Sequence, residues 1–136
     1  MNSYDKQAAD FLKKHGITFR AKLNDAKTPP WGDTGYGPGH HYRVTLAKPG
    51  ARVSFDFFDS AANYQKNILT LRPYDVLSCI GCDVNTPETF EGFCEECGYD
   101  TDSRKTYALF ERCDRLARRL RAFFTEGERA DLSEIQ

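Results

Sequence analysis

The sequence predicts an α+β domain, in which a small antiparallel sheet of about three strands packs against three to four helices. Three short runs in the N-terminal half alternate apolar and polar residues, as strands with one buried face do. In the C-terminal half the apolar residues recur every three or four positions, which is typical of helices with one buried side. The length of 136 residues suits one folding unit, so we expect residues 1–136 to form a single domain.

A helix and a strand are predicted at the start of the chain. The helix covers Ser3–His15, with Ser3 as its N-cap and Gly16 as the residue that ends it. The strand that follows should place four apolar side chains on one buried face: Ile17, Phe19, Ala21 and Leu23.

A long loop and a hairpin come next. Residues 24–41 contain too many glycines and prolines for regular structure, so we expect a loop. Beyond it, alternating residues over Tyr42–Leu46 and Val53–Phe57 flank the turn sequence Pro49-Gly50, which predicts a β-hairpin.

The C-terminal half is predicted to be helical. One helix begins near Pro73, and a second begins at Thr86-Pro87-Glu88 and ends at Gly98. A longer helix is expected over Ser103–Phe124, followed by a last turn or two within Glu126–Ile135. The buried side of the long helix should hold Tyr107, Phe110, Cys113, Leu116, Ala117, Leu120, Phe123 and Phe124.

Charge is balanced overall but unevenly distributed. The formal net charge of −1 argues against a strongly basic nucleic-acid binder and against an acidic mimic of DNA. Between Arg72 and Arg104 there are eight acidic residues and no Lys or Arg, and the following helix carries seven basic residues from Arg104 to Arg121. Whether these acidic and basic segments form separate faces stays open.

The N-terminus and the apolar content favour a cytoplasmic protein. The first residues lack the apolar stretch of a secretion signal, and no segment approaches the roughly 18 consecutive apolar residues of a membrane span. In a reducing compartment the five cysteines are expected as thiols or metal ligands rather than disulfides.

Four cysteines form the most distinctive chemical pattern of the chain. Cys79, Cys82, Cys94 and Cys97 follow the spacing C-x2-C-x11-C-x2-C, which approaches that of a structural zinc site. However, Cys94 and Cys97 also share one helix face with Phe90 and Phe93, and free cysteine packs well as a small hydrophobe. Cys79, one turn from the apolar Val76, has the same core interpretation. We therefore assign no metal site and no cofactor, and keep zinc as the alternative.

Two groups of residues are candidate partner contacts. The first lies in the predicted loop, where aromatic side chains would be exposed anchors: Trp31, Tyr36, His40 and His41. The second lies on the long helix and could contact phosphates or an acidic partner: Arg112, Arg115 and Arg119. A solvated face is the alternative for the helix, because Glu111–Arg115 and Asp114–Arg118 are favourable pairs one turn apart.

No catalytic residues are predicted. The carboxylates of Asp100 and Asp102 have no evident third partner, and Asp102 or Ser103 is better explained as the cap of the long helix. No nucleophile with its base can be identified, so we expect a protein that is not an enzyme.

Three blocks of sequence resemble a family. They are FDFFDSAANYQKN, then RPYDVLSCIGCDVNTPETFEGFCEECGYDTDSRKTYALFERC, then FFTEGERADLSEIQ, and together they cover roughly Tyr42 to Gln136. In content and order they resemble a group of small proteins from phages, prophages and integrative elements. In that pattern the positions matching Cys79 and Cys94 are often cysteine, whereas those matching Cys82 and Cys97 are more often polar or aromatic. The resemblance thus implies a fold that needs no metal.

The resemblance also implies a class of function. Such proteins generally have no assigned activity, and some small accessory proteins of mobile elements act against host defences, including CRISPR systems. We therefore expect a non-enzymatic accessory protein that acts in the bacterial cytoplasm by binding a host protein, such as a component of a defence complex, rather than nucleic acid. The alternative is a zinc-stabilised nucleic-acid-binding module that uses the basic helix face. Metal content distinguishes the two, while the partner and the oligomeric state stay open.

Overall fold

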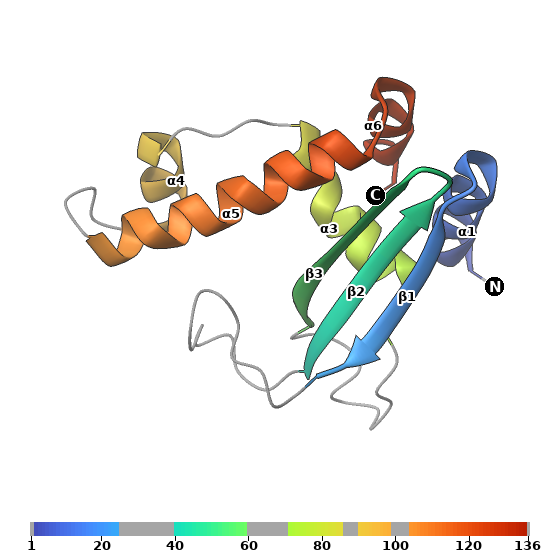
Figure 1. Cartoon of the computed structure of the whole chain (residues 1–136), viewed down its shortest axis with the longest axis horizontal. Helices are drawn as coiled ribbons and strands as arrows, with labels where there is room; N and C mark the ends of the chain where they lie inside the picture. Colours follow the sequence, from blue (N-terminus) through green and yellow to red (C-terminus); the bar gives the residue numbers. More distant parts are fainter. Residues whose placement is uncertain (1, 25–39, 60–70, 86–89, 99–103, 136) are drawn as a thin grey trace.

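A computed structural model describes residues 2–24, 40–59, 71–85, 90–98 and 104–135 of the chain. It confirms the α+β prediction, because a three-stranded antiparallel sheet is combined with helices that lie mostly in the C-terminal half (Figure 1). The described elements, in chain order, are α1 (Ser3–His15), β1 (Thr18–Leu23), β2 (His40–Lys48), β3 (Ala51–Asp59), α3 (Pro73–Asn85), α4 (Phe90–Cys97), α5 (Arg104–Phe123) and α6 (Glu126–Leu132).

The sheet has the order β1-β2-β3, with β2 in the centre. The predicted turn at Pro49-Gly50 is confirmed: Lys48 pairs with Ala51, and Gly50 has a φ of 81°, which glycine adopts without strain. Because side chains alternate across a strand, the register defines an inner face that the helices cover. Its best-buried residues, all 4% exposed or less, are Tyr42, Val44, Leu46, Val53 and Phe55.

The helices close the core over this inner face. In Figure 1, α3 passes behind the sheet and α5 runs above it, so β3 lies between the sheet centre and α5. Three phenylalanine rings join α1 to the C-terminal end of α5. The rings of Phe123 and Phe124 meet edge to face with centroids 5.0 Å apart, and the centroids of Phe11 and Phe124 are 6.2 Å apart. At Gly81 of α3, a methyl group would lie only 3.4 Å from the carbonyl oxygen of Leu132, so α3 and α6 pack closely.

Burial rises along α5, and this corrects part of the prediction. Tyr107 is 49% exposed and Cys113 is exposed, although both were expected on the buried side, whereas Leu120 is 1% exposed. With 20 residues, α5 is about 30 Å long, which exceeds the span of the core. Its N-terminal half extends away from the sheet and lies beside α4 instead (Figure 1).

Smaller corrections concern the strands and a cap. The N-cap of α1 is Asn2 rather than Ser3, since the Asn2 side chain accepts a hydrogen bond from the Asp5 N–H at 2.8 Å. On β1, Ala21 and Leu23 are exposed despite their inner-face positions, because the helices cover only the first part of this edge strand. The predicted helix starts at Thr86 and Ser103 lie outside the described residues.

A cluster of five ionisable side chains holds α6 against the rest of the fold, and we call it the α6 anchor: Lys14, His15, Lys48, Glu128 and Asp131. At its centre, Lys48 Nζ lies 2.6 Å from Glu128 Oε1, and both side chains are nearly buried. Asp131 lies 2.7 Å from His15 Nε2 and 2.8 Å from Lys14 Nζ. The anchor therefore connects three distant segments, α1, the end of β2 and α6.

Both carboxylates of the anchor are held in the charged form. Burial alone would raise the pKa of Glu128, but hydrogen bonds from Lys48 and from the Thr125 N–H, with the nearby charges of Lys48 and His15, bring it below its ordinary value of 4.5. Hydrogen bonds from Lys14 and His15 lower the pKa of Asp131 below 3.8. Glu128 also completes a capping box with Thr125, so one side chain both starts α6 and docks it.

Two glycines provide a matched test of helix geometry. Gly16 ends α1 with a φ of 64°, and an added methyl group would meet no atom within 4 Å. We expect Gly16→Ala to lower the free energy of unfolding by about 1 kcal/mol through backbone strain alone. Gly127→Ala, in equally open space within α6, should raise it by up to about 1 kcal/mol. Urea unfolding measures both, and a loss at both positions would contradict the assigned conformations.

The α6 anchor makes stability depend on pH. Because the folded pKa values lie below the unfolded ones, the two carboxylates stabilise the fold above about pH 4.5, and this contribution is lost as the pH falls through the lowered values. Glu128→Gln should cost about 2 to 4 kcal/mol at pH 7, since it leaves Lys48 nearly buried without a counter-charge, and should flatten the acid decline.

The control for this change is Asp10→Asn, which breaks an exposed pair with Lys6 and should cost less than about 0.5 kcal/mol. Urea unfolding between pH 7 and pH 3 compares the three proteins. Equal stability of the Glu128→Gln and Asp10→Asn variants at pH 7 would show that the anchor contributes little.

Candidate partner interface

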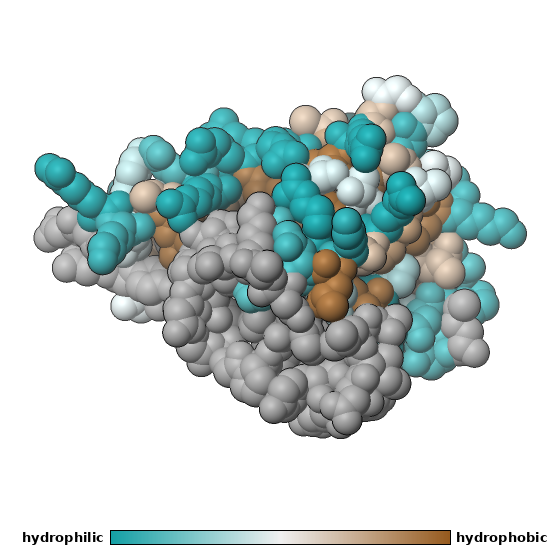
Figure 2. Space-filling view, turned by 60° about the horizontal axis from the view of Figure 1, so that its bottom comes forward, coloured by the Kyte–Doolittle hydropathy of each residue, from teal (hydrophilic) through white to brown (hydrophobic). Residues whose placement is uncertain are grey.

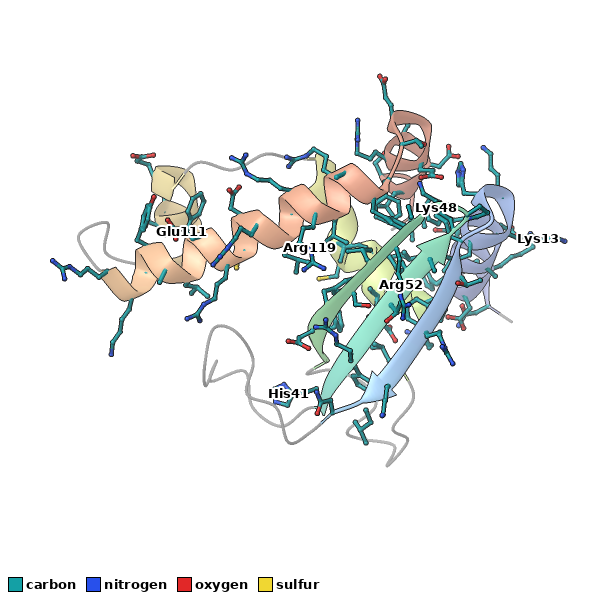
Figure 3. All side chains as sticks on the ribbon, in the orientation of Figure 1. Lys13, His41, Lys48, Arg52, Glu111 and Arg119 are labelled. Carbon is teal, nitrogen blue, oxygen red and sulfur yellow. The ribbon has the colours of Figure 1, made fainter. Side chains whose placement is uncertain are left out.

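Three arginines line one side of α5, and we call them the arginine stripe: Arg112, Arg115 and Arg119. They lie at i, i+3 and i+7, so they share one face of the helix, and all three are exposed. At the C-terminal end of the stripe, Arg119 Nη2 donates a hydrogen bond to the Ser54 carbonyl oxygen at 2.9 Å. Figure 3 shows Arg119 pointing from α5 toward β3. The stripe therefore starts at the edge of the sheet and runs outward along α5.

One of the two ion pairs predicted along α5 is present. Of the two predicted pairs, Asp114–Arg118 is confirmed, with Oδ2 and Nε 2.8 Å apart, but it lies beside the stripe rather than within it. The predicted pair of Glu111 with Arg115 is not formed, and Arg115 makes no ion pair with any residue of the described segments. The solvated face that was the alternative therefore has one of its two predicted ion pairs in the described structure.

The other predicted contacts do not join the stripe. Trp31 and Tyr36 lie outside the described residues, as does the side chain of His40. His40 and His41 begin β2 instead of ending a loop, which corrects the prediction. His41 is half-buried and lies at the opposite end of β2 from Lys48 (Figure 3). Arg119 meets β3 where Ser54 pairs with Thr45, about 14 Å of strand away from His41.

The sequence prediction missed a second basic surface, on the side of the sheet that faces away from the helices. Figure 2 shows hydrophilic side chains over much of the described surface, with apolar ones in small groups between them. We define the outer sheet face by ten residues whose side chains alternate with the buried ones: Thr18, Arg20, Lys22, His41, Arg43, Thr45, Ala47, Arg52, Ser54 and Asp56. Its four cations, Arg20, Lys22, Arg43 and Arg52, are all exposed.

The cations of the outer sheet face are mostly unpaired. Arg43 Nη1 lies 3.1 Å from Asp56 Oδ1, across the β2–β3 pair. Arg20, Lys22 and Arg52 form no ion pair with any described residue. Elsewhere in the described segments, carboxylate partners are found for Lys6, Lys14, Lys48, Arg72 and Arg118. Strand alternation in the sequence also indicates these outer positions, but only the register shows that cations from three strands share one face.

The cysteines divide between two environments. Cys94 on α4 is 2% exposed, which confirms its predicted place in the core. Cys79 is exposed although Val76 and Ile80 of the same helix are buried, and this corrects its predicted burial. The side chains of Cys82 and Cys97 are outside the described part. Within the described residues, no three His, Cys, Asp or Glu side chains are placed to hold a metal ion.

Two further findings bear on the class of protein. None of the helices in the described segments is both long enough and apolar enough to cross a membrane. Comparison of the chain with family models, with curated proteins and with solved structures found no match.

Proposed function

We propose that this chain is a non-enzymatic accessory protein of a phage or other mobile element. In this proposal it acts in the bacterial cytoplasm by binding a host protein, such as a component of a CRISPR-type defence complex. The observation that carries the binding role is the arginine stripe, an exposed row of guanidinium groups on one face of α5. The class of partner rests on the resemblance of Tyr42 to Gln136 to proteins of such elements.

The arginine stripe has the chemistry of a protein interface. Arginine binds carboxylates through two parallel hydrogen bonds, and it is enriched where protein interfaces have their strongest contacts. Tyr107, 49% exposed with its ring centroid 6.4 Å from that of Phe110, is an exposed aromatic side chain on the same helix, N-terminal to the stripe. The partner surface expected from this chemistry is acidic, with an apolar patch.

The stripe is also held in a fixed place. The last turn of α5 is anchored by Leu120 and Phe123 in the core, and Arg119 is tied to β3. Lys48, which lies over the Phe123 ring at 4.7 Å, is in turn bound by Glu128 of the α6 anchor. Binding would therefore require little ordering of the backbone, which lowers its entropic cost.

The α6 anchor contains the types of ionisable residue that active sites use, but its role is structural. Each carboxylate of the α6 anchor already accepts hydrogen bonds from a cation, and the two shifted pKa values favour the charged form. Catalytic acids and bases instead have pKa values moved toward the operating pH. This supports the proposal of a binding protein rather than an enzyme.

Reversal of charge on the stripe tests the proposal. Tagged protein should capture a specific host protein from nuclease-treated bacterial lysate, and Arg112→Glu combined with Arg115→Glu should reduce the capture at least about tenfold, because like charges across an interface cost several kcal/mol. The matched control reverses two exposed cations on α1, Lys6→Glu and Lys13→Glu, and should retain the partner. Quantitative mass spectrometry of the captured proteins gives the readout.

Two outcomes would contradict the proposed function. One is the absence of any specific protein partner in lysates of hosts that carry the relevant defence systems. The other is equal loss of capture by the stripe variant and the α1 control, which would indicate a general charge effect.

Metal content tests the alternative. We expect protein purified without a histidine tag to contain no stoichiometric zinc and to keep its melting temperature in a chelator, because Cys94 is buried in the core whereas Cys79 is exposed. A structural zinc site needs four thiolates around one point. Elemental analysis that finds about one zinc per chain would favour the zinc-stabilised module instead.

A further inference from the structure

We propose a second binding activity, in which the outer sheet face binds the phosphate backbone of a nucleic acid. This surface is distinct from the arginine stripe, and its partner belongs to a different class. Four exposed cations stand on it with a single carboxylate, that of Asp56, among the described residues of the face. Three segments far apart in the sequence contribute these cations, since Arg20 and Lys22 come from β1, Arg43 from β2 and Arg52 from β3.

The strand register fixes how the cations are spaced. Lys22 pairs with Arg43 across β1 and β2, so their backbones lie about 5 Å apart. Arg20 is two residues from Lys22 along β1, so their backbones lie about 7 Å apart. Arg52 lies on β3 at the level of Thr18, which is two residues from Arg20 along β1. The cations therefore frame an area of about 10 by 14 Å, which is wide enough to engage several phosphates.

Small polar side chains form the floor between the cations. The Thr45 and Ser54 hydroxyl groups are 2.8 Å apart and hydrogen-bonded to each other, and Thr18 Oγ1 donates to the Ala47 carbonyl oxygen at 3.3 Å. No bulky side chain of the described residues stands in this central part, so a polymer backbone can approach the four cations together. Hydroxyl groups are also common contacts of phosphate oxygens.

The described residues of the outer sheet face include no apolar centre, and this favours nucleic acid over an acidic protein as the partner. Protein interfaces need a well-packed centre of apolar or aromatic anchors, surrounded by a polar rim. Here the centre consists of Thr18, Thr45, Ala47 and Ser54, which offer no such anchor. Binding to phosphates needs none, because release of counterions supplies the free energy. The overall charge of −1 does not oppose this, because three cations of this face, Arg20, Lys22 and Arg52, form no ion pair with any described residue.

The chemistry predicts weak binding that does not depend on sequence. Contacts to phosphate carry no base information, and non-specific dissociation constants are typically about 10⁻⁴ to 10⁻⁶ M. Four phosphate contacts predict that log K falls with log salt with a slope of about −3.6 for duplex DNA.

The test uses the whole chain and a fluorescein-labelled DNA duplex of about 20 base pairs. Fluorescence anisotropy between about 50 and 200 mM salt gives the affinity and its salt slope. The triple variant Arg20→Gln, Lys22→Gln, Arg52→Gln should bind at least about tenfold more weakly at 50 mM salt, with the slope reduced in magnitude by about 3. The control, Lys6→Gln, Lys13→Gln, Lys105→Gln, removes the same charge from exposed sites on α1 and α5 and should keep the wild-type slope.

Several results would overturn the proposal. They are no binding of the duplex by the wild-type chain at about 50 mM salt, equal losses in the triple variant and its control, or binding of poly-glutamate without binding of the duplex. The last result would assign the face to an acidic protein. Far-ultraviolet circular dichroism checks that both variants fold, as expected for exposed positions. Because the arginine stripe is intact in both, failure here leaves the capture of a host protein unaffected.

Discussion

The nearly buried ion pair of Lys48 and Glu128 fixes how α6 and the end of α5 pack against the sheet. It joins the turn of the β2–β3 hairpin to α6, and His15 and Asp131 extend it to α1. Because Glu128 also caps α6, loss of this side chain would weaken both the helix start and its docking. A nearly buried ion pair is costly to break, and here it secures the end of α5, from which the arginine stripe extends.

The sequence predicted the elements of the fold more fully than their environments. Helix ends at Gly16 and Gly98 and the turn at Pro49-Gly50 follow from local backbone preferences, which a single sequence contains. Leu23 and Cys113 are exposed because neighbouring elements do not cover the end of β1 or that part of α5. Such coverage depends on tertiary packing, which a local pattern does not reveal. The α6 anchor could not be foreseen for the same reason, since His15 and Glu128 are more than a hundred residues apart.

Of the two candidate binding surfaces, one could be predicted from the sequence and the other could not. Spacing along one helix identified the arginine stripe, because residues at i, i+3 and i+7 share a face whatever the fold. The outer sheet face was missed because its cations are spread over three strands, and only the register brings Lys22 beside Arg43. The cysteine spacing is the most distinctive chemical pattern of the sequence, yet Cys94 is explained by packing in the core. We therefore assign binding to exposed cations rather than to thiols.

We thus propose that two basic surfaces of one fold have different partners. Nuclear magnetic resonance of the ¹⁵N-labelled chain, titrated with duplex DNA at low salt, distinguishes the two surfaces. We expect backbone amide shifts to change on the outer sheet face, at Arg20, Lys22 and Arg52, while those of Arg112 and Arg115 stay in place. Changes confined to α5, or none at all, would show that the outer sheet face does not bind the duplex.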